Sequence, residues 1–316
     1  VVRGNKNMSK ENTAVTKKKI KRCKEDVVFD AACFIILTLV LFVVAYPLYW
    51  VIISSISAPS AVSSGKVLLH PIGFTLKGYA EVFKNDQVMR GFLNSLIITF
   101  CGVMVNLIVT LPTSYALSRS NFSGKKPITI FYLITMFFGG GLIPTYLVIQ
   151  RLQMLNTIWA LILPGCLSVY NMIVARTFFK SNISEELYEA AEIDGCTQAR
   201  FFFQIALPLS KAIIAILVLY YGVGHWNSYF SALVYISDKA KYPLQLVLRN
   251  ILITNQTALS QTATTAAARA ALQEKQQLID VMKYSLIIIS SIPVLVMYPL
   301  VQKHFVKGVM IGAVKG

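Results

Sequence analysis

Six long intervals of this sequence contain no aspartate, glutamate, lysine or arginine, and no other feature narrows the possible folds as much. They are residues 31–65, 91–118, 127–150, 152–175, 212–237 and 284–302. Each could cross about 30 Å of hydrocarbon as a helix, at roughly 20 residues per span. The intervals are apolar nearly all round, whereas helices of a soluble protein show a polar face every three to four residues. The pattern predicts membrane-spanning helices.

The predicted fold is an all-α polytopic membrane protein with six transmembrane helices. The spans are placed near residues 28–54, 92–117, 128–149, 154–175, 211–235 and 284–302. The charge-free interval 250–268 is rejected as a span because its Asn, Gln, Ser and Thr side chains would be costly in lipid. The first apolar stretch is too long for the core of a signal peptide, so we expect it to remain as a span.

The distribution of lysine and arginine predicts the orientation of the chain. With a cytoplasmic N-terminus, the inner segments hold 19 of the 30 basic residues and the outer segments hold 11. This excess favours both termini in the cytoplasm. The predicted parts outside the spans are a basic cytoplasmic tail (1–27), a cytoplasmic loop (182–209), an extracellular loop (236–283) and a cytoplasmic C-terminal tail (303–316). The run Lys17 to Lys24 is explained by this orientation, with binding to anionic headgroups as a further role left open.

Several kinds of chemistry lack their motifs in this sequence. There is no G-x-x-x-x-G-K-[ST] phosphate loop, so we expect no ATP hydrolysis by this chain itself. No span carries an interior carboxylate or lysine, which argues against ion or proton coupling. His225 is the candidate proton relay, but a hydrogen-bonding role is favoured. The five cysteines have no paired spacing, so neither disulfides nor a metal site is predicted.

A short charged segment, SEELYEAAEIDGCTQARFFFQIALPL (184–209), lies between the fourth and fifth predicted spans. Ser184 is a good N-cap and is followed by two glutamates that complement the positive helix end. Leu187, Ala190 and Ala191 are predicted to share a flat, narrow face. Gly195 suits a left-handed turn that ends this helix.

A second short helix is predicted to start at Thr197 and to end at Pro208. It contains Phe201, Phe202 and Phe203 and is expected to lie along the membrane surface. From the residues alone, two explanations of the whole segment remain open. It is either an interfacial loop with phenylalanines in the headgroups or a docking element for a soluble partner.

The segment also resembles a known signature. It is similar to the EAA motif of ABC importer permeases. The matching residues are Glu189-Ala190-Ala191, then Gly195 after three residues, Ile205 after nine more, and Leu207-Pro208 after one more. The C-terminus (303–316) resembles that of maltose-type, MalG-like permeases. Three further stretches resemble the LplC-like branch, which is associated with complex oligosaccharides. They are FGGGLIPTYLVIQ (138–150), NTIWALILPG (156–165) and YPLQLVLRNIL (242–252). The resemblance covers the chain from about residue 28 to its end.

The resemblance implies a multi-pass subunit of a bacterial cell membrane importer. Its implied partners are a second, non-identical permease, two cytoplasmic ATP-binding cassette ATPases and an extracellular solute-binding lipoprotein. ATP and Mg would be bound by partner subunits, and no cofactor by this chain. The implied ATPase-coupling residues are Glu189, Ala190, Ala191, Asp194, Gly195, Leu207 and Pro208. Lys307, Gly308 and Gly312 are expected near the ATPase, with a frayed terminus as the alternative.

The fifth predicted span carries an unusual set of hydrogen-bonding side chains: Tyr220, Tyr221, His225, Trp226, Asn227 and Tyr229. They suit a neutral sugar, and we expect them along the substrate pathway, although bonds to neighbouring helices would also explain them. Asn94 and Asn106 are assigned to such helix contacts. The run Gly139 to Gly141 with Pro144 is expected to bend or break the third span.

The leading hypothesis is a permease subunit of an ATP-driven oligosaccharide importer. In this hypothesis the long loop 236–283 forms a shelf with short helices that contacts the binding protein. Two alternatives remain: an ABC permease for another solute, such as peptides or amino acids, and a secondary carrier or channel that acts alone.

Overall fold

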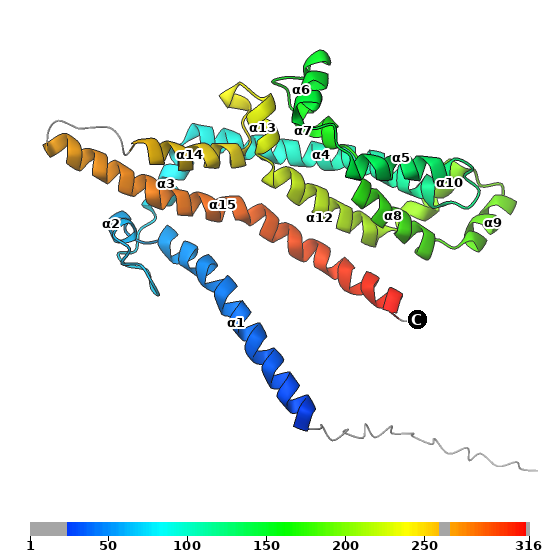
Figure 1. The fold of residues 1–316 in the computed structure, drawn as a ribbon, viewed down its shortest axis with the longest axis horizontal. Helices are drawn as coiled ribbons and strands as arrows, with labels where there is room; N and C mark the ends of the chain where they lie inside the picture. Colours follow the sequence, from blue (N-terminus) through cyan, green and yellow to red (C-terminus); the bar gives the residue numbers. More distant parts are fainter. Residues whose placement is uncertain (1–23, 259–265, 314–316) are drawn as a thin grey trace, which may run out of the picture. The chain divides into compact units, whose positions relative to one another are not determined.

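The structure is a computed structural model that describes the backbone of residues 24–258 and 266–313, and the side chains of residues 24–253, 276–299 and 301–302. Over these residues every regular element is a helix (Figure 1), as the sequence predicted. The chain divides into two units, Val1–Tyr49 and Trp50–Gly316, each described by itself. The basic run at residues 17–23 and residues 314–316 of the predicted tail lie outside the described residues.

Among the described residues, three helices are long and apolar enough to cross a membrane. They are α1 (Lys24–Ser55), α4 (Asp86–Ser118) and the part Gln276–Pro299 of α15 (Ala266–Ala313), and they contain the first two predicted spans and most of the sixth. The apolar stretch of α1 has no buried side chain, which is a suitable surface for lipid. Because α15 is one continuous helix, the expected boundaries at residues 283 and 303 are not breaks in the structure.

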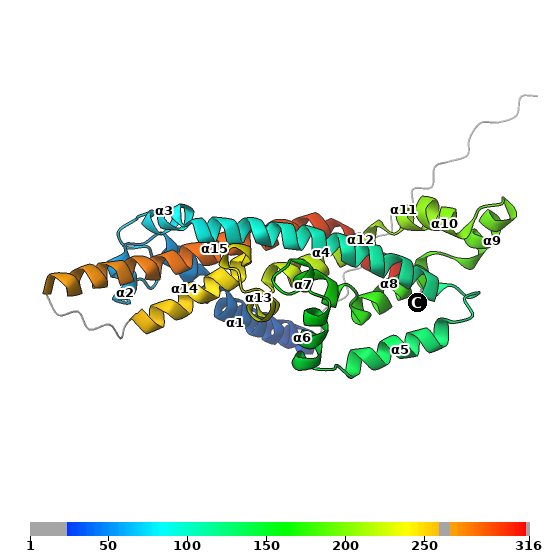
Figure 2. The same cartoon turned by 90° about the horizontal axis from the view of Figure 1, so that it is seen from above.

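The third and fourth predicted spans are bent helix pairs. The helices α5 (Lys125–Phe137) and α6 (Leu142–Arg151) meet at 113° (Figure 2), with the glycine run between them. This confirms the predicted break, and Gly141 takes a positive φ of 85° there. The fourth span consists of α7 (Trp159–Ile162), the 3-10 turn η1 (Leu163–Gly165) and α8 (Val169–Asn182), with a bend of 52°. Counting each bent pair as one span gives up to six spans.

The fifth span differs from the single helix expected over residues 211–235. The helix α12 (Lys211–Asn227) ends before an extended residue, Ser228, and α13 (Phe230–Tyr235) follows as a separate short helix. The bent partner of α12 is instead the preceding segment Gln198–Leu209, at 80°. The polar residues at 227 and 228 mark the end of the apolar run, and the Ser228 N–H closes the last turn on the carbonyl of His225 at 3.2 Å.

In its described residues, the segment 236–283 contains short helical elements, as its length suggested, together with the first part of a long helix. It contains the 3-10 turn η3 (Lys239–Lys241), the 15-residue helix α14 (Leu244–Ala258) and the first part of α15. The helix α14 packs against α4 and α15, and its first N–H, from Leu244, donates to Ser95 Oγ at 2.8 Å. Asn94 donates to the carbonyls of Ala240 and Tyr242. This contact confirms the structural role predicted for Asn94.

The helix α4 is the element around which the site is built. It packs against α8, α12 and α14, while α2 (Pro59–Ser63) and α3 (Lys77–Lys84) pack against α15 (Figure 1). At the C-terminal end of α4, the largest buried cluster joins it to α8, α12 and the segment between them. That segment consists of α9 (Glu185–Ile193), α10 (Gln198–Phe201), the π-helix η2 (Phe202–Ala206) and α11 (Leu207–Leu209).

Candidate functional site

The two short helices of the 184–209 segment are capped as their sequence predicted. Ser184 Oγ accepts from the N–H of Leu187 at 3.3 Å at the start of α9. Thr197 Oγ1 accepts from the N–H of Arg200 at 3.4 Å at the start of α10. Both side chains satisfy N–H groups that have no partner within the helix.

The turn between the two helices depends on Gly195. Its φ is +72°, a left-handed conformation that side chains other than glycine adopt at a cost. The N–H of Gly195 donates to the carbonyl of Glu192 at 3.0 Å, and the N–H of Cys196 donates to that of Ala191 at 2.9 Å. This pair of bonds is a Schellman motif, which ends a helix sharply. The prediction of a glycine turn is confirmed.

The helix α9 has an inner and an outer side. Tyr188 is buried, and Ala191 packs against the same core. Glu189 and Ala190 are exposed, and Ile193 is 86% exposed. The expected flat face of Leu187, Ala190 and Ala191 is therefore divided, because the inward-facing Tyr188 lies one turn before Ala191. The outer side is an apolar and acidic surface that the described part of the chain leaves exposed.

The remaining predicted coupling residues divide in the same way. Asp194 and Gly195 belong to the exposed turn. Leu207 packs partly against the core, and Pro208 is exposed. The seven residues predicted for coupling thus lie on α9, in the turn after it and on α11, with Ala191 and Leu207 turned toward the chain itself.

Most of the phenylalanine run faces the interior of the protein and not its surface. Phe201 and Phe202 are buried, and only Phe203 is largely exposed, at 64%. The burial has a physical reason: Tyr115 of α4 lies 5.0 Å from the Phe202 ring centre, and Tyr188 lies 5.3 Å from that of Phe201. These rings form an aromatic cluster in edge-to-face and tilted contacts, which stabilise more than area alone. Phe201 and Phe202 therefore pack the segment against α4.

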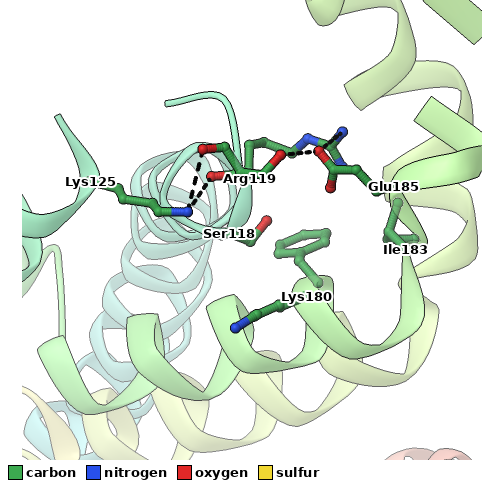
Figure 3. A pocket seen from close by; sticks show the side chains of 8 residues that line it. Ser118, Arg119, Lys125, Lys180, Ile183 and Glu185 are labelled. Carbon is green, nitrogen blue, oxygen red and sulfur yellow. Dashed lines mark hydrogen bonds and ion pairs between the residues drawn. The ribbon is translucent and has the colours of Figure 1, made fainter. Parts of the chain in front are cut away.

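A buried arginine lies at the junction of α4 and α9 (Figure 3). Arg119, the C-cap residue of α4, places its guanidinium 4.0 Å from the centre of the Tyr188 ring. Its Nη2 also donates to Glu185 Oε1 at 3.2 Å. Sequence reasoning assigned Glu185 only to the helix dipole and did not identify Arg119 or Tyr188. A tyrosine among glutamates and an arginine directly after a charge-free interval were the available signals.

A small cavity lies beside this junction (Figure 3), with a volume of about 190 Å³. Lys125 and Lys180 line it together with Arg119 and Glu185. Lys125 Nζ donates to the carbonyls of Arg119 and Ser120 at 3.2 and 3.4 Å. The residues that follow α4, the start of α5 and the start of α9 therefore meet at one place.

The predicted pathway residues on α12 and after it do not act as one group. Trp226 is buried and donates to the carbonyl of Ser290 at 2.8 Å. Tyr221 is buried, and its hydroxyl bonds Thr110 Oγ1 at 2.8 Å. These two side chains therefore bond neighbouring helices, which was the alternative to a role in the substrate pathway. Asn227 and Tyr229 are exposed and line none of the cavities described here.

Three of the pathway residues do share a cavity of about 400 Å³, namely Tyr220, Tyr221 and His225. His225 Nε2 pairs with Asn106 Oδ1 at 2.7 Å, and Asn106 Nδ2 donates to the carbonyl of Gly165 at 2.8 Å, so the predicted helix contact of Asn106 is confirmed. Sequence reasoning missed the other hydrogen-bonding residues of the lining: Ser168, Asn171, Ser228, Ser231 and Tyr235.

Lys307, Gly308 and Gly312 belong to the last turns of α15, and their side chains lie outside the described residues. Over the described residues no group of three or more His, Cys, Asp or Glu side chains is placed to hold a metal ion. The candidate site thus consists of the exposed side of α9 and the cavity beside His225.

Comparison with known proteins places this architecture in a family. No family model matches the sequence. The chain is 36% identical over 288 residues to the polygalacturonan/rhamnogalacturonan transport system permease protein YtcP of Bacillus subtilis. The aligned part covers 91% of this chain and 98% of YtcP. The chain belongs to the sugar ABC transporter permeases. Protein LplC of the same organism is 38% identical over 289 residues, 92% of this chain and 95% of LplC.

A solved structure agrees with this assignment. A bacterial ABC transporter involved in the import of the acidic polysaccharide alginate contains a chain with a TM-score of 0.80 and 27% identity. The match covers 90% of this chain and 99% of that one. Membership in the MalG- and LplC-like permeases makes this chain a multi-pass protein of the bacterial cell membrane, in agreement with its apolar helices.

Proposed function

We propose that this permease is one of two non-identical membrane subunits of an ATP-driven, binding-protein-dependent oligosaccharide importer, and that α9 is its docking site for an ABC ATPase. The observation that carries the proposal is the two-sided structure of α9. Its inner side is fixed by Tyr188 in the core, while Ala190 and Ile193 on its outer side are uncovered. Exposed apolar side chains on a fixed, acidic element are suited to a protein partner.

The proposal includes the orientation in which both termini are cytoplasmic. The contact of Arg119 with Glu185 brings the loops 119–126 and 182–209 to the same end of the helices, as alternating spans require in either orientation, and the basic residues decide which side that end faces. Both loops were assigned to the inner side from their basic residues. An arrangement with these loops on opposite sides of the membrane is incompatible with this contact.

The other partners follow from the same proposal. Two cytoplasmic ATPase subunits bind ATP and Mg, and this chain contributes no ATPase site. The segment 236–283, on the opposite side, is where we expect the solute-binding lipoprotein, and α14 gives that segment a fixed support against α4. Lys307, Gly308 and Gly312 remain proposed contacts near the ATPase.

We also propose that the cavity at His225 contributes to the solute pathway. Its lining offers the hydroxyls of Ser168, Ser231 and Tyr235, and none of its residues is lysine, arginine or a carboxylate. Such a lining bonds sugar hydroxyls and presents tyrosine rings to C–H surfaces, whereas an amino acid or ion would call for charge. The cavity therefore favours a neutral sugar over a charged solute.

Two alternatives are distinguished by different measurements. Titration of the cognate binding protein with oligosaccharides, peptides and amino acids identifies the solute class, and tight binding of a peptide would remove the sugar assignment. A carrier that acts alone would move sugar in liposomes that contain only this chain.

The test of the proposed function compares two sets of proteoliposomes. Vesicles with the complete complex, the binding protein and the oligosaccharide are expected to accumulate sugar only when ATP is supplied on the ATPase side. Vesicles with this chain alone are expected to show the flux of empty liposomes, because no energy source or closed pathway is present. ATP-independent uptake by the chain alone would contradict the proposal.

A further inference from the structure

Arg119 is held in an environment that a charged side chain enters only with compensation. Its side chain is 8% exposed. The rings of Tyr188, Tyr115 and Phe201 lie 4.0, 5.8 and 5.9 Å from its guanidinium carbon. Aromatic faces attract a guanidinium, and a carboxylate partner offsets the loss of water. Three of these four partners, Tyr188, Phe201 and Glu185, belong to the segment that contains α9.

The end of α4 binds the first residue of α9 through two side chains. Arg119 Nη2 donates to Glu185 Oε1, and Ser120 Oγ donates to the same oxygen. Glu185 lies 66 residues after Arg119 in the chain, so this link is independent of chain connectivity. Figure 3 shows both charged side chains reaching toward each other across the junction.

This link adds a connection that the backbone does not provide. The helix α9 is joined covalently to α8 before it, and to α12 after it through α10, η2 and α11. It has no such connection to α4. A movement of α9 would reach α8 and α12 along the chain, and α4 indirectly through the packing of these two helices against it. Arg119, Ser120 and the aromatic cluster give α9 a direct contact with the end of α4.

The helix α4 leads from this junction to the cavity of the proposed pathway. Thr110 of α4 bonds Tyr221, and Asn106 bonds His225. A separation of 13 residues from Arg119 to Asn106 corresponds to about 20 Å of helix. The same continuous helix, which contains Pro112 between the two places, therefore carries the junction at one end and two hydrogen bonds to the cavity wall further along.

We infer that Arg119 is the positioning residue that makes α9 and α4 move as one body, so that displacement of α9 by the ATPase reaches the cavity through α4. The inference rests on the proposed function, because it requires the ATPase to act on α9. A loss of this link should weaken the coupling of ATP hydrolysis to transport, since α9 could still dock while α4 followed its movement less closely.

The experiment measures ATP hydrolysis and sugar uptake in the same proteoliposomes that contain the complete complex. Arg119→Met keeps an unbranched apolar side chain between the rings and removes the charge, and Glu185→Gln removes the other charge. We expect Arg119→Met to reduce uptake by about tenfold, within the range of about 5- to 150-fold that is typical of coupling between sites. Hydrolysis should stay close to that of the wild type, so the ATP used per sugar rises. Glu185→Gln should shift this ratio in the same direction by a smaller factor.

Lys180→Met is the matched control, because Lys180 lines the same cavity, is exposed and makes no hydrogen bond or ion pair among the described side chains. The amount of ATP hydrolysed per sugar taken up should be the same in Lys180→Met as in the wild type. Equal losses of uptake and hydrolysis in Arg119→Met, failure of both junction variants to assemble, or an unchanged ratio would each overturn the inference. Photo-crosslinking of α9 to the ATPase in the wild type separates these results from a failure of the proposed function, in which no crosslink would form.

Discussion

Replacing Gly195 with valine is expected to abolish ATP-driven sugar uptake while the membrane subunits still assemble. Gly195 has a φ of +72°, and a Cβ added there meets no heavy atom of the described residues within 4 Å apart from its own chain neighbours. The cost within the chain is therefore the left-handed conformation alone, roughly 1–2 kcal/mol. The larger effect should arise in the complex, where the new side chain projects from the turn into the surface that the ATPase covers. Uptake in proteoliposomes and size-exclusion chromatography of the complex measure the two effects.

Gly65→Val is a matched control for this prediction. Gly65 has a φ of +70°, and a Cβ there also meets nothing within 4 Å, but it lies between the first and second spans. It carries the same backbone cost without a contact to the ATPase, so uptake should remain near the wild-type rate. Gly195→Asn separates bulk from strain further, because asparagine tolerates the left-handed conformation. Equal losses in Gly65→Val and Gly195→Val would attribute the effect to backbone strain and contradict a docking role for the turn.

Gly102→Ala is the second substitution expected to reduce uptake strongly, by about tenfold. The helices α4 and α12 approach closely at this position, and a Cβ on Gly102 would lie 2.5 Å from His225 Nε2. The imidazole would have to move, and its bond to Asn106 and its position in the cavity wall would change. Overpacking of this kind typically costs about 1–3 kcal/mol. Since α9 is not involved, hydrolysis stimulated by the binding protein should persist while uptake falls.

Gly222→Ala provides the comparison for this second prediction. Gly222 is also buried in a membrane helix, but its new methyl group would meet the end of the Met297 side chain, which is flexible. Near-normal uptake is expected for this variant. If Gly102→Ala transported sugar as well as Gly222→Ala, the cavity at His225 would not belong to the pathway.

The sequence was informative wherever structure depends on neighbours along the chain. Charge-free intervals predicted the apolar helices, and Ser184, Thr197 and Gly195 predicted the caps and the turn around α9. The run of three glycines before Pro144 predicted the break between α5 and α6. Each of these features follows from local backbone or side-chain chemistry.

What could not be predicted depends on contacts between distant residues. Three adjacent phenylalanines look alike in sequence, yet Tyr115 and Tyr188 bury two of them and leave Phe203 exposed. The division of α9 into two sides follows from the same cluster. The pairing of Arg119 with Glu185 joins residues far apart in the chain. Hydropathy also could not predict the end of α12 at Asn227, since the apolar residues of α13 continue the pattern after a short break.

The central claim is that the outer side of α9 is where an ATPase transmits force to this permease. Its most direct test is photo-crosslinking from a benzoylphenylalanine placed at position 190 or 193 in the assembled complex in membranes. Position 74 is the control, because Phe74 is also largely exposed, at 71%, but lies between the first and second spans. We predict covalent capture of the ATPase subunit from both positions on α9 and none from position 74. Absence of ATPase capture from α9 in a complex that transports sugar would contradict the account.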